Sequence, residues 1–584
     1  MKSNKRSSGR KASAGASATA AVPAAKTGPP WWHYVAGIAA AMFVAFEVYG
    51  PAVRGPFLFD DRYLPFFAPG LAEEPFWAWI YGVRPLLMAS FWLNFRMGQT
   101  DAYWYHVFNV IFHLGNAILI WLIVERILEW AGVDAARRRI LGIFSGVLFL
   151  VHPVQTESVA YVASRSENLS VLLFNSALAL FVCRRSVAVG WRIAAAVLVL
   201  FLAACLTKEH AAVLPVLLLL TDYYWNPGFT LEGIRRNAKL YLPIAAGAAA
   251  AGVWIWRVLR YAPTAGFGIK DLPWYEYFYS QCRAIWIYVR MFVLPYGQNV
   301  DHEFAVSRSI LDHGAIVGML ALVAVSVAAW IYRRRYPLAS YGWFAFLILL
   351  APTSSFVPIR DLLVERRLYL PFIGLLLICC EFLRRVKATR TVLAGALACV
   401  TAIFAFAAYQ RNTAWSDPVE LWKDAAEKSP HKSRPAFQLA YAYYAEGRCA
   451  DAAGEYEKAS RLEKPDYSLY VDWALAYDCA QKPDAALEKL RQAIALEKTA
   501  HAYATMAKVY AQQNQRQEAL DALAEAEKLD PRFEVTYVYR GNVYLMANDY
   551  AKAAVEFRRA LALNPADMAA RNGLDMAERQ SPRM

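Results

Sequence analysis

Apolar residues occur along the first 410 positions in long runs that are separated by short polar loops. A helix of roughly 20 apolar residues is long enough to cross a bilayer. Eleven runs of about this length lie at 34–53, 104–128, 140–163, 167–183, 190–206, 210–225, 239–257, 314–332, 340–357, 368–383 and 391–409. This pattern predicts an all-α, polytopic membrane domain with about eleven spans over residues 31–410.

Basic residues form clusters in alternate loops of this arrangement. The clusters lie at 137–139, 184–192, 235–239, 333–335 and 384–390. Because Lys and Arg are enriched in cytoplasmic loops, these loops are expected in the cytoplasm and the C-terminal region outside. The apolar stretch 274–296 contains Arg283 and Arg290 and would break the alternation if it crossed. It is therefore predicted to lie in the outer interface or to enter and leave the same face.

Residues 1–30 are rich in Ser, Ala, Gly and Pro, carry six basic residues and have no apolar period. Such a segment is predicted to be a disordered cytoplasmic tail. The apolar core of a cleaved signal peptide, about 7–15 residues long, would follow its charges closely. Here the first apolar run begins only after Pro29 and Pro30 and is long enough to span. The first span is therefore predicted to be a retained anchor.

From residue 433 the apolar spacing becomes helical and the pattern repeats. Alanines separated by 34, 33 and 34 residues recur at Ala452, Ala486, Ala519 and Ala553. A small residue precedes each alanine by twelve positions, and a tyrosine follows that small residue by three. This is the pattern of the tetratricopeptide repeat, whose stacked copies form a concave surface that holds peptides or proteins. We expect four repeats over 433–584, ending in a capping helix at 569–584, and a linker helix at 411–432.

The composition agrees with a membrane protein, since 58% of the residues are hydrophobic and 19% are charged. In soluble proteins, roughly 45–50% of the residues are apolar and about 25% are charged. The net charge is +14, but residues 433–584 contain 20 basic and 22 acidic residues, so the positive excess lies upstream. A nucleic-acid-binding domain would carry its own basic face. The distribution instead favours loops beside anionic membrane lipids, and no nucleic-acid partner is expected.

Charged residues gather in four loops that are predicted on the outer side. The first loop contains Asp60 and Asp61, and adjacent carboxylates can act as a general base or hold a metal. An ordinary acidic loop is the alternative. In the second, Glu157, Tyr161 and Arg165 are spaced four residues apart and would share one helix face. A Glu–Arg pair that only satisfies itself between helices is the alternative there.

The third loop contains Lys208, Glu209 and His210, where Lys208 can hold a phosphate as a point charge or serve as an interfacial anchor. The fourth combines six charged or hydroxyl residues, which are Arg360, Asp361, Glu365, Arg366, Arg367 and Tyr369. Arginines are disfavoured on the outer side, so these are predicted to hold an anion such as a lipid phosphate. Pairing with the two neighbouring carboxylates is the alternative. Arg283 and Arg290 can add to the same site.

Other catalytic motifs do not compete in this sequence. It contains no phosphate-binding Gly-rich loop followed by Lys and Ser or Thr, no Gly-x-Ser-x-Gly elbow and no Cys-x-x-Cys site. Six of the eight cysteines lie in or near the apolar runs and are interpreted as small apolar residues. Cys449 and Cys479 lie in neighbouring repeats and are predicted to form a disulfide if the outer compartment is oxidising.

Taken together, the motifs resemble the family of transmembrane O-mannosyltransferases with tetratricopeptide repeats, over nearly all of the chain after residue 30. The resemblance rests on the order of Asp60-Asp61, His152-Pro-Val-Gln-Thr-Glu157 with Ser164-Arg165-Ser-Glu167, Lys208-Glu209, Glu365-Arg366-Arg367-Leu-Tyr369-Leu-Pro371, and Arg411-Asn412-Thr-Ala-Trp415. It implies a GT-C type glycosyltransferase whose donor is a polyprenyl-phosphate sugar. The Ala-rich composition suits a bacterial relative.

The resemblance also implies roles for the matched residues. Asp60 or Asp61 would be the general base that deprotonates the acceptor hydroxyl. The leaving lipid phosphate would be stabilised by Arg165, Lys208, Arg366 and Arg367, with Arg283 or Arg290, and Tyr369 would donate a hydrogen bond. These groups would be supported by His152, Glu157, Glu209 and Glu365. A single base implies inversion at the sugar carbon. No cofactor beyond the lipid-linked sugar is required, and dependence on a divalent metal stays open.

The expected function is transfer of mannose or a similar hexose from a polyprenyl-phosphate donor to a hydroxyl of an acceptor protein bound by the repeats. Membrane lipids are the other expected partners. The repeats would lie in the periplasm of a bacterial inner-membrane protein, or in the lumen of the endoplasmic reticulum. Two alternatives stay open, a non-catalytic membrane scaffold with protein-binding repeats and a ligase or polymerase of lipid-linked glycans.

Overall fold

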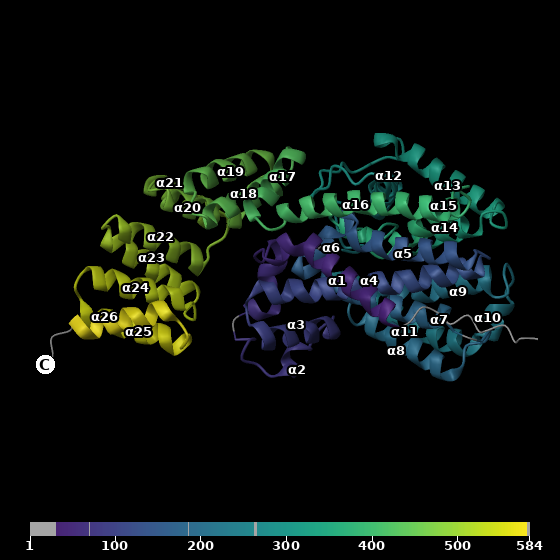
Figure 1. The fold of residues 1–584 in the computed structure, drawn as a ribbon. Helices are drawn as coiled ribbons and strands as arrows, with labels where there is room; N and C mark the ends of the chain where they lie inside the picture. Colours follow the sequence, from purple (N-terminus) through teal and green to yellow (C-terminus); the bar gives the residue numbers. More distant parts are fainter. Residues whose placement is uncertain (1–30, 69, 185, 262–264, 581–584) are drawn as a thin grey trace, which may run out of the picture.

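The computed structural model describes residues 31–68, 70–184, 186–261 and 265–580, and the basic tail expected at 1–30 lies outside these ranges. Within the described residues the chain is all-helical, as predicted, and its extended pairing is limited to an isolated bridge between Ala265 and Ile359. A helical part with the apolar helices comes first, and a stack of shorter helices lies beyond the C-terminal end of its last long helix (Figure 1).

Fewer helices can cross a membrane than the apolar runs suggest. In the described part of the chain, four helical segments are long and apolar enough: α1 (Trp31–Val53), α4 (Ala102–Trp130), Asp312–Ile331 with α13 (Ala315–Ile331), and α16 (Arg390–Ala414). A fifth is added if α5 (Ala135–Val151) and the bent continuation Pro153–Ala160, which contains α6 (Thr156–Ala160), count as one broken span. The expectation of about eleven spans is therefore wrong, since the described residues contain four candidate spans, or five with the bent pair.

The number of spans is overestimated because an apolar run does not show where a helix breaks. The run 140–163 bends by 51° near His152-Pro153, and the run 210–225 divides into a 3-10 turn and α9 (Leu214–Trp225). Several other runs form short apolar helices: α8 (Trp191–Cys205), α14 (Pro337–Leu350) and α15 (Phe372–Leu383). At roughly 1.5 Å per residue, helices of this length do not cross a hydrocarbon core of about 30 Å.

The remaining helices of this part connect or cover the long ones. They are α2 (Phe76–Trp79), α3 (Pro85–Gly98), α7 (Arg165–Val182), α10 (Glu232–Arg236), α11 (Ala238–Tyr261) and α12 (Trp274–Val293). The segment α12, expected not to cross, is not among the candidate spans and packs against α13 and α15. Near the centre of Figure 1, α4 packs against α1, α5 and α7.

Two glycines allow α4 and α5 to approach closely. A Cβ atom at Gly146 would lie 2.8 Å from the carbonyl oxygen of Ala117, and one at Gly142 would lie 3.0 Å from the Cβ of Glu125. Small residues at such positions let helix backbones come together in an apolar environment. A groove lined by residues of α1, α4 and α5 lies beside this pair.

The C-terminal part consists of paired helices in a regular stack. It contains α18 (Ser433–Ala445), α19 (Cys449–Leu462), α20 (Tyr467–Cys479), α21 (Pro483–Leu496), α22 (Ala500–Gln512), α23 (Arg516–Leu529), α24 (Glu534–Met546), α25 (Tyr550–Leu563) and α26 (Met568–Gln580). The four periodic alanines are fully buried between them. A connecting helix, α17 (Pro418–Lys428), precedes the stack, and the boundary expected at residue 410 falls inside α16.

The predicted disulfide is present in the repeats. Cys449 and Cys479 are bonded, with their Cα atoms 5.7 Å apart, and they join the start of α19 to the end of α20. The other six cysteines are free. This bond confirms the register that the sequence assigns to the first two repeats.

Candidate functional site

The two carboxylates of the first outer loop lie in different environments. Asp61 is fully buried, and its two oxygens accept hydrogen bonds from the backbone N–H groups of Leu58 at 3.0 Å and Ala163 at 2.7 Å. Burial raises the pKa of Asp61 to about 7 despite these bonds. Asp60 is exposed, and its backbone N–H donates to the hydroxyl of Tyr161 at 3.2 Å. Asp61 therefore holds the loop, whereas the carboxylate of Asp60 is accessible.

Arg366 also lies close to Tyr161. Its guanidinium forms an ion pair with Glu157, its backbone N–H donates to the same carboxylate at 3.0 Å, and its centre lies 5.9 Å from the ring of Tyr161. Glu157 is buried and Arg366 is partly exposed. The structure thus brings the first, second and fourth predicted loops together around one tyrosine.

The third loop adds further charges to this cluster. Nζ of Lys208 lies 2.9 Å from the carboxylate of Glu167, and Arg366 interacts electrostatically with both residues. Glu209 accepts two parallel hydrogen bonds from Arg84, at 2.9 and 2.8 Å. Three cations, on Arg84, Lys208 and Arg366, therefore lie at one site, each beside a carboxylate.

Several predicted phosphate-binding groups are used otherwise. Arg165 is fully buried and donates to the carbonyl oxygen of Tyr105 at 2.9 Å and to Oδ1 of Asn109 at 3.0 Å, with its guanidinium 4.6 Å from the ring of Phe91. Its donors point into the protein. Arg165 stabilises the packing of α3, α4 and α7 and is not available to a ligand in this arrangement.

Arg367 and Tyr369 are also engaged by the protein. Arg367 donates to the carbonyl oxygens of Leu362 at 3.1 Å and Asp361 at 2.5 Å, which shapes its own loop. The hydroxyl of Tyr369 lies in a buried polar network with His113 at 2.8 Å, Asn116 at 3.2 Å and Asn168 at 2.9 Å. The expectation that these two residues contact a donor phosphate has no support from these contacts.

Arg283 and Arg290 lie on α12, and none of their described contacts reaches the cluster. Arg283 donates to the carbonyl oxygen of Ala305 at 3.0 Å and to Oγ of Ser307 at 2.9 Å, and Arg290 lies 4.3 Å from the ring of Tyr296. His152 is buried, and its ring bonds the carbonyl oxygen of Phe292 at 3.0 Å. It holds the bend after α5.

Glu365 connects the site to the repeats rather than to Arg366. It accepts hydrogen bonds from the side chain of Gln298 at 2.7 Å, the backbone N–H of Asn299 at 2.6 Å and the ring of His302 at 3.0 Å. Burial opposes its ionisation, but the hydrogen bond and charge of His302 hold the pKa of Glu365 below its usual range. The ionised carboxylate therefore organises the segment around residue 300.

That segment binds the first repeat. Asp301 pairs with Lys432 and with Arg434, and Arg434 also donates to Asp361 at 2.7 Å. A second link comes from Arg62, which donates to Oε1 of Gln438 at 3.0 Å. Charged groups from three loops, at Arg62, Asp301 and Asp361, thus attach the first repeat beside the site.

Sequence reasoning missed several of these residues. Arg62, Arg84, His302 and Arg434 were not predicted, although Arg62 and Arg84 carry the same signal as Arg366, an arginine in a predicted outer loop. Within the described residues, no three His, Cys, Asp or Glu side chains are grouped as a metal site would require.

Comparison with known proteins adds a family context. Residues 535–567 match the family model described as tetratricopeptide repeat. The chain is 22% identical over 396 residues to protein O-mannosyl-transferase F38B6.6 of Caenorhabditis elegans, covering 66% of this chain and 54% of that protein. It is 22% identical over 499 residues to human protein O-mannosyl-transferase TMTC1, covering 71% of this chain and 54% of that protein. It is 20% identical over 544 residues to human protein O-mannosyl-transferase TMTC3, covering 83% of this chain and 58% of that protein.

The chain spans about half the length of the curated relatives it matches. Among solved structures, it resembles YrrB, a tetratricopeptide-repeat protein, with 19% identity and a TM-score of 0.24 over 32% of this chain and 89% of that one. The chain is therefore similar, at low identity, to proteins that are named protein O-mannosyl-transferases and contains a tetratricopeptide repeat.

Proposed function

We propose that this protein is a membrane glycosyltransferase that moves mannose or a similar hexose from a polyprenyl-phosphate donor to a hydroxyl of an acceptor protein. The observation that carries the proposal is the position of Asp60. Its accessible carboxylate lies in the loop that contacts Tyr161, and Arg366, which interacts electrostatically with Lys208, lies 5.9 Å from the ring of the same tyrosine. The similarity to protein O-mannosyl-transferases supports the same reaction class.

In the proposed reaction, Asp60 accepts the proton of the acceptor hydroxyl. The oxygen of that hydroxyl attacks the anomeric carbon of the donor sugar at the same time. The bond between that carbon and the phosphate oxygen breaks, and the negative charge on the leaving lipid phosphate is stabilised by Arg366 and Lys208. Glu157 and Glu167 hold these two cations in position.

The stereochemical outcome follows from the number of available carboxylates. Retention by double displacement requires a second carboxylate that attacks the sugar carbon. Both oxygens of Asp61 accept backbone hydrogen bonds, and the side chain is buried. Asp60 therefore acts alone in the proposed mechanism, which leads to inversion.

The repeats would present the acceptor protein. Their first pair of helices is attached to the loop of Asp60 through Arg62 and to the segment of Asp301 through Arg434. A polypeptide held on the concave surface would therefore enter the site from the side of Asp60. This surface would lie in the periplasm, or in the lumen if the membrane is that of the endoplasmic reticulum.

Transfer from a lipid donor tests this proposal. The full chain, purified in detergent, would be given polyprenyl-phosphate mannose with a labelled sugar and a co-expressed candidate acceptor. We expect labelled protein with inverted configuration at the sugar carbon. Transfer that requires a nucleotide sugar, or label that appears only on lipid-linked glycan, would contradict the proposal.

A further inference from the structure

An apolar groove lies between α1, α4 and α5, and on α1 it is lined by residues of the first half of the helix, whereas the loop of Asp60 follows the other end. It has a volume of about 320 Å³. Its walls are formed by apolar residues from the three helices, including Ile38, Leu114, Ile143 and Leu150. The mechanism proposed above does not use this groove.

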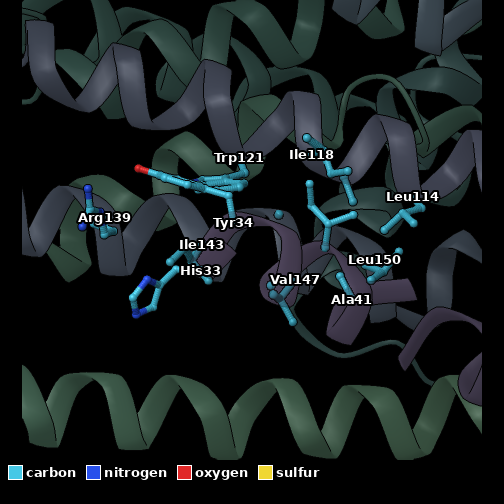
Figure 2. A pocket seen from close by; sticks show the side chains of 14 residues that line it. His33, Tyr34, Ala41, Leu114, Ile118, Trp121, Arg139, Ile143, Val147 and Leu150 are labelled. Carbon is cyan, nitrogen blue, oxygen red and sulfur yellow. The ribbon is translucent and has the colours of Figure 1, made fainter. Parts of the chain in front are cut away.

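One end of the groove is polar. His33, at the start of α1, and Arg139, in the first turns of α5, lie there, and Figure 2 shows both side chains at the same end, away from Leu114 and Leu150. The rings of Tyr34 and Trp121 line the groove nearby, with centroids 6.4 Å apart. Tyrosine and tryptophan are enriched where a membrane meets water. The groove therefore has the polarity of a single lipid molecule, from headgroup to chain.

The acidic residues near this end are already paired with other arginines. Glu125 accepts a hydrogen bond from Trp121 at 2.8 Å and lies 3.8 Å from Arg138. Glu129 pairs with Arg126 at 2.6 Å and with Arg138 at 3.4 Å. Arg139 is exposed, and across the described ranges no hydrogen bond or ion pair engages its guanidinium. Its charge is thus available to an anion at the mouth of the groove.

One residue that lines the groove is a glycine with open space beside it. A Cβ atom at Gly37, which lines the groove, would have no heavy atom within 4 Å. A larger side chain at this position would enter the groove without a clash against the protein. Gly37 therefore offers a way to fill the groove and leave the helix packing intact.

We propose that this groove binds a phospholipid with an anionic headgroup, with one acyl chain between α1, α4 and α5 and the phosphate beside Arg139 and His33. Charge complementarity selects an anionic lipid over a zwitterionic one. The proposed phosphate position is separate from the proposed donor site, because His33 lies near the start of α1 and the loop of Asp60 follows the other end of this helix.

Native mass spectrometry of the full chain in detergent tests this proposal. Phosphatidylglycerol and phosphatidylcholine with identical acyl chains are the two probes. We expect one copy of phosphatidylglycerol to be retained about fivefold more tightly than phosphatidylcholine, the effect of one basic residue at an anionic surface. The variants Gly37→Leu and Arg139→Gln should each lose this preferential retention.

Two matched variants serve as controls. Gly395→Leu adds the same side chain at an exposed, open position of α16, and Arg192→Gln removes an exposed arginine at the start of α8. Both should retain phosphatidylglycerol like the unmodified protein. Equal retention of the two lipids, unchanged retention in Gly37→Leu or Arg139→Gln, or an equal loss in the controls would overturn the proposal. If Gly37→Leu does not insert, Arg139→Gln and its control decide the question.

Discussion

Arg62 and Gln438 are 376 positions apart in the sequence, yet the guanidinium of Arg62 donates to Oε1 of Gln438 at 3.0 Å. The same guanidinium lies 4.6 Å from the ring of Tyr441, also on α18. Arg62 follows Asp60 by two residues. The first repeat and the proposed general base are therefore held in a fixed relation, which is what delivery of a protein acceptor requires.

Removal of this link should affect protein acceptors more than small ones. We expect Arg62→Ala to lower the transfer rate to a protein acceptor about tenfold, since hydrogen bonds of charged groups contribute roughly 1.5–3 kcal/mol. Transfer to a short hydroxyl peptide should change little. Arg54→Ala, an exposed arginine at the end of α1, is the control. An equal loss with both acceptors would show that Arg62 does not act through the repeats.

Asp61 should be a structural residue whose amide analogue is tolerated. Asp61→Asn keeps one hydrogen-bond acceptor and should cost about 1 kcal/mol, whereas Asp61→Leu leaves the N–H groups of Leu58 and Ala163 unsatisfied and should cost several times more. Thermal unfolding of the purified variants measures the difference. Equal melting temperatures for the two variants would contradict this role.

The pH dependence of stability provides a second test of Asp61. Its pKa rises from 3.8 to about 7 on folding, so the folded state binds the proton more tightly. Its contribution to stability is fully present below about pH 4 and is lost as the pH rises to 7. The melting temperature of Asp61→Asn, relative to the unmodified protein, should therefore increase between pH 5 and 7. A constant difference would contradict the assignment.

The junction between the helical part and the repeats should weaken in acid. Burial opposes the ionisation of Asp361, but Arg434 holds the pKa of this carboxylate below its usual range. Burial also opposes the ionisation of Glu365, whose pKa is held below its usual range by His302. Their stabilisation is therefore present above the ordinary carboxyl pKa of about 4 and is lost as the pH falls further. Arg434→Met should cause the same weakening at neutral pH.

Limited proteolysis around residues 415–432 measures this weakening, with the exposed Arg448→Met as the control. We expect Arg434→Met to be cleaved faster than the unmodified protein at neutral pH. Cleavage of the unmodified protein should become faster only at acid pH. If Arg434→Met is cleaved no faster than the control, the ion pairs with Asp301 and Asp361 do not hold the junction.

The disulfide should be detectable by its chemistry. Thiol titration of the denatured, unreduced protein should find six of the eight cysteines free. Cys449 and Cys479 close a loop with a sequence separation of 30, for which the chain-entropy model gives about 3–4 kcal/mol of stabilisation. Reduction should lower the melting temperature of the repeats accordingly. A count of eight free thiols would contradict the bond.

The repeats could be predicted in detail because their signal is local. Helices that pack at close range need small residues at fixed positions, so Ala452 and its counterparts recur visibly, and the register places Cys449 near Cys479. The spans could not be counted in the same way. Hydropathy shows that a run is apolar, but it does not show that a helix breaks at His152-Pro153 or that α15 begins only after Pro371.

The site was predictable at the level of loops but not of side chains. Asp60 and Asp61 are adjacent and chemically identical, and only the contact with Ala163, about a hundred positions later, shows which one is buried. The sequence predicts the same role for Arg165 and Arg366, stabilisation of the leaving lipid phosphate. The first points into a cluster of Phe91 and Tyr105, and the second remains beside Tyr161.

Sugar transfer by Asp60→Asn, with Asp61→Asn as the adjacent comparison, tests the proposed general base most directly. Glu73→Gln, an exposed acid in the same loop, is the control. With folded, purified protein, polyprenyl-phosphate mannose and an acceptor protein, we expect Asp60→Asn to lower the rate at least about 100-fold, the usual range for loss of a general base. Asp61→Asn should keep most activity and Glu73→Gln all of it. Full transfer by Asp60→Asn would contradict the assignment.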